Sequence, residues 1–135
     1  MSINNFSIKK ILNNLYTDIN YDEISHDFIK YSYSLSNLIN FINICKNENL
    51  DFENITIDNF LKYIFENNLY KNKKYQNIDF KIFIEIFFRK KINFINKDKI
   101  FNLYSYFNLR FDKCKKFNLD MESFFLEFNS KLLNE

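Results

Sequence analysis

The sequence predicts an all-α fold, a compact bundle of six to seven helices with no sheet. Apolar residues recur at spacings of three and four along most of the chain, which is the period of a helix with one buried face. The chain has 135 residues, 47% of them hydrophobic, and this is enough apolar material for one core. It contains no Gly, Pro, Ala, Val or Trp, so Ile, Phe and Leu must fill the helix contacts. We therefore expect a single helical domain over residues 1–135.

The first two elements are predicted from apolar spacing and from polar residues that can cap a helix. A first helix is expected from about 6 to 17, because its apolar residues follow one another at helical spacing. Asn20 or Asp22 can cap a second element. The apolar residues of this second element are Ile24, Phe28, Tyr31 and Leu35.

The second element either continues as one helix or restarts after Ser34 or Ser36, since either serine can cap a new helix. Residues 47–54 are rich in Asn, Asp and Glu and are expected to form a loop. Thr56 or Asp58 can then cap a third helix.

Residues 79–91 fit two structures, and we predict a helix. Isoleucine and phenylalanine alternate with other residues there as in a β-strand. However, Lys81, Glu85 and Arg89 are four residues apart, which places both possible partners of Glu85 on one stripe of a helix. A strand that exposed Lys81 and Glu85 would also expose Phe83 and Phe87, and this outcome is unfavourable.

Two further helices complete the predicted bundle. The first runs from Asn96 or Asp98 to about Asn108, with Ile100, Phe101, Tyr104 and Phe107 as its apolar residues. The second runs from Asp120 to Leu133 through Phe124, Phe128 and Leu132. Because Gly and Pro are absent, the turns between helices must fall to Asn and Asp, which tolerate the left-handed backbone region best.

A possible internal sequence repeat suggests an alternative domain organisation. Cys45–Glu53 and Cys114–Glu122 are similar at an offset of 69 residues. Within them, Asn49–Glu53 and Asn118–Glu122 both resemble the start of a helix. A duplicated three-helix unit would give two halves, 1–67 and 68–135. The biased composition makes a match of this quality expected by chance, so the single domain is preferred.

The composition excludes several chemistries. Phosphate-binding P-loops, dinucleotide-binding motifs and the nucleophile elbow of hydrolases all need Gly or other small residues, which this chain lacks. Phe, Ile, Lys, Asn and Tyr supply 86 of the 135 residues, and their codons are AT-rich. We therefore expect an AT-rich genome: a low-GC bacterium, one of its phages or plasmids, or a large DNA virus.

No constellation of residues points to catalysis, a metal or a cofactor. His26, the only histidine, lies near Asp22 and is expected to be an exposed residue in an acidic first turn rather than a metal ligand. Glu85 is expected to be a paired surface carboxylate rather than an acid of raised pKa. Cys45 and Cys114 have no metal-binding spacing and nothing places either beside the histidine. The sequence therefore predicts a protein that is not an enzyme.

Charge is distributed unevenly along the chain. Residues 1–67 carry a net charge of −4 and residues 68–135 a net charge of +6. Between residues 71 and 116, 13 basic side chains accompany 4 acidic ones, with aromatic residues nearby. Such a region suits the phosphate backbone of nucleic acid, although only two arginines are present. The nucleic-acid-binding candidates are Lys71, Lys73, Lys74, Arg89, Lys90, Lys91, Arg110, Lys113, Lys115 and Lys116.

Aromatic residues make up 20% of the chain, more than one small core can hold. Tyrosine is favoured at interfaces, so the partner-binding candidates are Tyr31, Tyr33, Tyr63, Tyr70 and Tyr75. The preferred function is a non-enzymatic helical binding protein that docks onto a larger macromolecule. A viral or mobile-element effector that inhibits a host defence complex is one instance, and a self-associating protein is a variant. The alternative is a phosphate-backbone binder or a small ribonucleoprotein subunit.

The expected location is intracellular, in a bacterium or an infected host cell. No secretory signal is visible at the amino terminus, and the two cysteines are expected to be reduced thiols. The longest uncharged run, from Tyr31 to Cys45, contains Ser and Asn and is too short to span a membrane. We therefore expect no membrane association.

Overall fold

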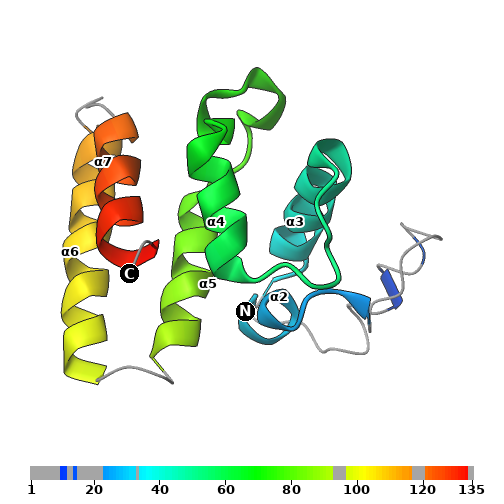
Figure 1. Cartoon of the computed structure of the whole chain (residues 1–135), viewed down its shortest axis with the longest axis horizontal. Helices are drawn as coiled ribbons and strands as arrows, with labels where there is room; N and C mark the ends of the chain where they lie inside the picture. The colour runs from blue at the N-terminus through cyan, green and yellow to red at the C-terminus, as the bar shows by residue number, and fades with distance from the viewer. Residues whose placement is uncertain are drawn as a thin grey trace. The chain divides into compact units, whose positions relative to one another are not determined.

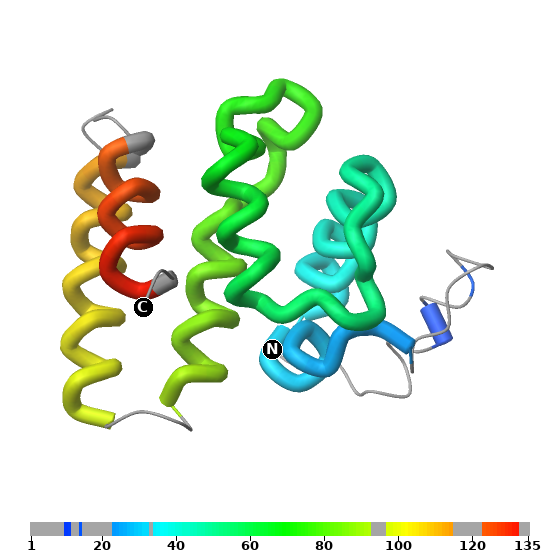
Figure 2. Tube along the Cα trace, in the orientation of Figure 1, coloured from blue at the N-terminus to red at the C-terminus, as the bar shows by residue number. Residues whose placement is uncertain are grey.

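The computed structural model describes residues 10, 11, 14, 23–32, 34–92, 97–116 and 121–133. These residues form six α-helices and no strand, which confirms the predicted all-α fold (Figures 1 and 2). The helices are α2 (His26–Tyr31), α3 (Leu35–Glu48), α4 (Ile57–Glu66), α5 (Lys81–Lys91), α6 (Lys97–Lys116) and α7 (Met121–Phe128). Short 3-10 turns η2 (Leu69–Lys71) and η3 (Lys73–Tyr75) follow α4, and a π-helical turn η4 (Asn129–Leu133) follows α7. Most of the helix expected over 6–17 lies outside the described residues.

The chain divides into two compact units, Met1–Ile57 and Asp58–Glu135. We call them the amino-terminal and the carboxy-terminal unit and describe each by itself. The division falls after the first residue of α4. The single domain and the alternative of halves 1–67 and 68–135 both stay predictions.

The interior of the amino-terminal unit forms around two stacked rings. Phe28 of α2 and Phe41 of α3 have centroids 3.6 Å apart with an interplanar angle of 10°, and both rings are fully buried. The two helices are separate because Ser32 and Ser34 adopt extended backbone, so the chain restarts after Ser34 as one of the sequence alternatives predicted. Apolar residues of α3 at helical spacing, among them Leu38 and Ile42, complete this core.

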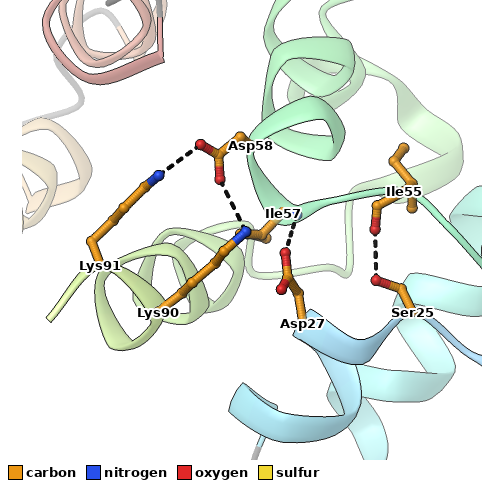
Figure 3. A network of polar contacts seen from close by, with 7 residues as sticks. All are labelled: Ser25, Asp27, Ile55, Ile57, Asp58, Lys90 and Lys91. Carbon is orange, nitrogen blue, oxygen red and sulfur yellow. Dashed lines mark hydrogen bonds and ion pairs between the residues drawn. The ribbon is translucent and has the colours of Figure 1, made fainter. Parts of the chain in front are cut away.

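Ser25, which precedes α2, and Asp27 of α2 form hydrogen bonds to the segment after α3 (Figure 3). The hydroxyl of Ser25 donates a 2.6 Å hydrogen bond to the carbonyl of Ile55, and the backbone N–H of Ser25 donates to the carbonyl of Phe52 at 2.8 Å. The carboxylate of Asp27 accepts from the backbone N–H of Ile57 at 3.0 Å. A helix leaves its first N–H groups unpaired, so Asp27 stabilises the first turn of α4.

Asparagine takes the place of glycine at two turns. Asn49 ends α3 with φ of 57°, and Asn68 follows α4 with φ of 54°. The N–H of Leu50 then donates to the carbonyl of Cys45 at 2.9 Å, which closes the end of α3. The prediction that Asn would supply left-handed backbone is confirmed. The expected helix start at residues 49–53 is wrong, because these residues form turns and α4 begins at Ile57.

Helix α5 confirms the helical interpretation of residues 79–91. Its buried residues are Phe83, Ile84, Ile86, Phe87 and Phe88. The apparent strand alternation arises because α5 is buried on most sides, so its apolar residues are not confined to one stripe. Of the expected charge stripe, Glu85 pairs with Arg89 at 3.7 Å, whereas Lys81 pairs with Asp112 of α6 at 3.0 Å.

Phenylalanine rings from four helices meet around Phe128 of α7. Its ring centroid lies 5.1 Å from Phe107 of α6, 5.3 Å from Phe87 of α5 and 5.8 Å from Phe65 of α4. These three pairs are edge-on, which is the arrangement that the ring quadrupoles favour. Figures 1 and 2 show α6 and α7 side by side and antiparallel within this unit.

Helix α6 is longer than predicted. It continues past Asn108 to Lys116 because Phe111 and Cys114 extend the buried stripe of Phe107 at helical spacing. No Gly or Pro interrupts this stretch. Because α5 and α6 are antiparallel, the start of α5 and the end of α6 lie at one end of the unit (Figure 1).

Candidate functional site

The outer face of α6 carries large apolar side chains. Phe101 and Leu109 are each 62% exposed, and Tyr106 is 44% exposed. Residues eight apart lie on the same side of a helix, so Phe101 and Leu109 share one face, opposite the buried Phe107. Tyr106 is oriented by its hydroxyl, which donates to Glu127 of α7 at 2.8 Å. We call Phe101, Tyr106 and Leu109 the α6 outer surface, in which Leu109 lies between the other two, about 80° around the helix from Phe101 and about 60° from Tyr106.

Phe101, one of the apolar residues that predicted this helix, does not belong to its core. Neighbouring residues of an α-helix are about 100° apart, so a helix that buries Ile100 turns Phe101 away from the core. Residue spacing alone could have revealed this surface. The sequence analysis did not identify this surface, because its partner-binding candidates were all tyrosines.

The five tyrosine candidates occupy different environments. Tyr31 and Tyr75 are buried, at 6% and 3% exposure, so neither offers an accessible ring. Tyr63 and Tyr70 are half-buried. The ring of Tyr70 lies 4.3 Å from that of Phe125, and its hydroxyl donates to Asn68 at 3.3 Å. Tyr33 lies outside the described residues.

Several basic candidates whose side chains the structure describes form ion pairs within the carboxy-terminal unit, namely Arg89, Lys90, Lys91 and Arg110. Lys90 and Lys91 approach the carboxylate of Asp58 at 3.8 and 2.9 Å (Figure 3). This arrangement joins the last turn of α5 to the first turn of α4, and each charge complements the dipole of its own helix. Arg89 pairs with Glu85, and Arg110 pairs with Glu127 at 3.1 Å.

The remaining described candidates lie near one end of α6. Lys71, Lys73 and Lys74 are exposed on η2 and η3, and Lys113 is exposed near the end of α6. The side chains of Lys115 and Lys116 lie outside the described part. The last turn of α5, with Arg89 to Lys91, lies at the opposite end of this unit (Figure 1). The basic candidates are therefore divided between the two ends of the unit.

A pocket of about 350 Å³ opens at the end with the exposed lysines. It lies wholly within the carboxy-terminal unit. Its walls are the segment between α4 and α5, one ring from α6 and one ring from α7. The lining residues are Tyr70, Gln76, Asn77, Ile78, Asp79, Phe80, Phe111 and Phe125. The sequence could not reveal this pocket, because its residues come from three separate stretches of the chain.

The residues considered for chemistry lie in different environments. His26 is exposed in α2, and Glu85 is paired with Arg89. Cys45 and Cys114 are buried, and burial together with the charge of Asp51 raises the pKa of the Cys45 thiol to about 12. Such a thiol is a poor nucleophile at neutral pH. Among the described residues, no three His, Cys, Asp or Glu side chains form a group that could hold a metal ion.

In the part of the chain that the structure describes, no helix is both long and apolar enough to cross a membrane. No family model matches the chain, and neither the curated proteins nor the solved structures contain a match.

Proposed function

We propose that this chain is a non-enzymatic helical binding protein that docks onto a larger protein partner through the α6 outer surface. The observation that supports the proposal is the exposure of Phe101 and Leu109, 62% each, on one side of a helix whose opposite side is already buried. Isolated exposed apolar residues are common, but two on one helix face together with a tyrosine are typical of a binding surface.

The surface has the chemistry of a small binding centre. Complete burial of a Phe or Leu side chain contributes about 1.5–3 kcal/mol, so Phe101 and Leu109 would form the apolar centre of a larger contact area. Tyr106 adds a ring with a polar tip, held in place by Glu127. An effector that inhibits a defence complex of a host or bacterium is the instance that we favour, because the residue composition fits an AT-rich genome such as that of a virus or mobile element.

Site-specific photo-crosslinking tests the proposal. A photoreactive phenylalanine replaces Phe101 in one variant and Leu126 in another, and each variant is exposed to extract of the source cells. Leu126 is the matched control because it is 63% exposed but lies on α7. We expect a discrete adduct from position 101 that saturates and is competed by the unmodified chain. A Phe101→Ser/Leu109→Ser competitor, shown to be folded by circular dichroism, should compete poorly.

Three results would contradict binding through the α6 outer surface. They are identical adducts from positions 101 and 126, equal competition by the Phe101→Ser/Leu109→Ser variant, and no saturable adduct. An adduct with the mass of two copies of this chain would also contradict a larger partner and support the self-associating variant.

A further inference from the structure

The pocket at the end of α6 combines aromatic rings, amides and nearby cations. Its volume of about 350 Å³ lies at the lower end of small-molecule sites, which typically span about 300–1,000 Å³. Its walls come from elements that the core already fixes in place. Phe111 contacts Phe124 at 5.4 Å, and Phe125 contacts Phe65 at 4.7 Å. The core therefore fixes these two walls of the pocket.

Ring surfaces line the interior of the pocket. Tyr70, Phe80, Phe111 and Phe125 supply four aromatic side chains from three parts of the chain. Of these, Tyr70 is the most accessible, because it is half-buried whereas the other three are buried. A flat aromatic ligand can stack on Tyr70 and contact the edges of the remaining rings.

Polar groups at the pocket offer hydrogen bonds to the edge of such a ligand. Gln76 and Asn77 are exposed, and each carboxamide can both donate and accept. Asp79 adds an acceptor, one oxygen of which already accepts from the backbone N–H of Lys81 at 3.1 Å. Amide and carboxylate groups of this kind pair with the amino, imino and carbonyl groups of nucleobases.

Three lysines lie beside the pocket, on the segment between α4 and α5 that forms one of its walls. Lys71, Lys73 and Lys74 lie on η2 and η3, between the pocket residues Tyr70 and Gln76. Turn geometry fixes this stretch, since Asn72 caps η3 by accepting from the N–H of Lys74 at 2.9 Å. The three lysines are exposed and therefore accessible to the phosphates of a ligand.

We propose that this pocket binds single-stranded nucleic acid, with one base against Tyr70 and the adjoining phosphates on the lysines of η2 and η3. A duplex does not satisfy the site, because its bases are stacked on one another and cannot reach the rings. Four aromatic side chains and two amides have no role in a purely electrostatic interaction with a duplex backbone. The proposal does not depend on the α6 outer surface, which lies elsewhere on the unit.

Fluorescence anisotropy provides the first test. The complete chain is titrated into labelled single strands of about 12 nucleotides, of both RNA and DNA, and into the matching duplexes. Three phosphate contacts to a single strand predict a slope of log K against log salt near −2, so affinity should fall about 20-fold between about 50 and 200 mM salt. Weaker binding of the duplexes is expected. No binding of single strands at the lowest salt would overturn the proposal, as would equal binding of duplexes.

A matched pair of charge reversals locates the site. Lys73→Glu/Lys74→Glu should weaken binding at least 10-fold and reduce the salt slope by about 1.4, the contribution of two phosphates. Lys97→Glu/Lys99→Glu makes the same change of net charge at the opposite end of α6, where both lysines are also exposed. This control should retain most of the affinity. An equal loss in both variants would overturn the placement of the site.

The absence of tryptophan allows a direct test of base stacking. Tyr70→Trp places the sole tryptophan at the pocket, and Tyr106→Trp places it on the α6 outer surface. Stacking of a base should quench the fluorescence of the first variant upon addition of single strands and leave that of the second unchanged. Equal responses from the two variants would overturn the proposal, as would no quenching of the first under conditions where anisotropy reports binding.

Discussion

At the scale of single residues, the buried Cys45 thiol makes stability depend on alkaline pH. Burial and the nearby Asp51 raise its pKa from 9.0 to about 12 in the folded state. Between these values the unfolded chain binds fewer protons than the folded chain, so the free energy of unfolding falls as pH rises, by at most about 1.4 kcal/mol per pH unit.

Comparison with Cys45→Ala isolates this effect, because the other alkaline groups titrate in both proteins. We expect the two unfolding free energies, measured by urea denaturation, to converge as pH rises from 9 towards 12. A constant difference across this range would contradict the assignment. Below pH 9 the thiol is protonated in both states, and the difference should not change with pH.

Asp27 is a second residue whose role can be measured. Its carboxylate accepts from the N–H of Ile57, so Asp27→Ala should lower the free energy of unfolding by about 0.5–2 kcal/mol, the usual cost of losing a helix cap. Asp27→Asn retains an acceptor oxygen and should cost less. Urea denaturation measures both variants. Glu23→Ala serves as the acidic control, because Glu23 is exposed and the N–H of Ile57 donates to Asp27. Equal losses in Asp27→Ala and Glu23→Ala would contradict the capping role.

The tyrosine candidates show why binding residues were harder to predict than capping residues. A cap depends on local backbone, so the restart of the chain after Ser34 could be predicted from the sequence. Accessibility of a ring depends on which helices cover it. Tyr31 and Tyr75 differ little from Tyr63 and Tyr70 in sequence context, yet the first two are buried.

At the scale of elements, α7 provides a contrast between two neighbouring apolar residues. Phe128 is fully buried among rings from three other helices, whereas Leu126 is 63% exposed. Phe128→Ala should destabilise the chain by about 3–5 kcal/mol, because it removes a large buried ring and leaves a cavity. Leu126→Ala should change stability by less than about 0.5 kcal/mol. Thermal and urea unfolding measure both variants, and similar losses would contradict the observed packing.

Among the described residues, the existence of the helices was predicted better than their ends. The spacing of Lys81, Glu85 and Arg89 predicted helix α5. Of the two expected ion pairs, the one between Glu85 and Arg89 forms, whereas Lys81 pairs with Asp112. The end of α6 was placed too early because Asn108 resembles a terminating residue. Burial of Phe111 and Cys114 outweighs that local preference and carries the helix to Lys116.

At the scale of the whole molecule, the charge pattern along the sequence did not predict the charge pattern in space. Lys90 and Lys91 belong to the basic region of the sequence, yet both approach Asp58, more than 30 residues away. Such pairs depend on the antiparallel packing of helices, which the order of residues does not specify. The pocket and the exposed lysines beside it depend on the same packing, so they emerged only from the structure.

The division of the chain into two compact units raises the question of cooperativity. Because the division falls inside α4, between Ile57 and Asp58, neither unit contains this helix complete. We therefore expect one cooperative unfolding transition, as predicted for a single domain.

Phe28→Ala removes a fully buried ring of the amino-terminal unit and should lower the free energy of unfolding by about 3–5 kcal/mol. In a single domain, this loss should accelerate native-state hydrogen exchange of the slowest amides by about 100-fold or more in α5 as well as in α3. Phe128→Ala in the carboxy-terminal unit is the reciprocal variant and should do the same. Acceleration confined to the unit that carries the substitution would contradict the single domain, and would indicate that α4 unfolds with only one of the two units.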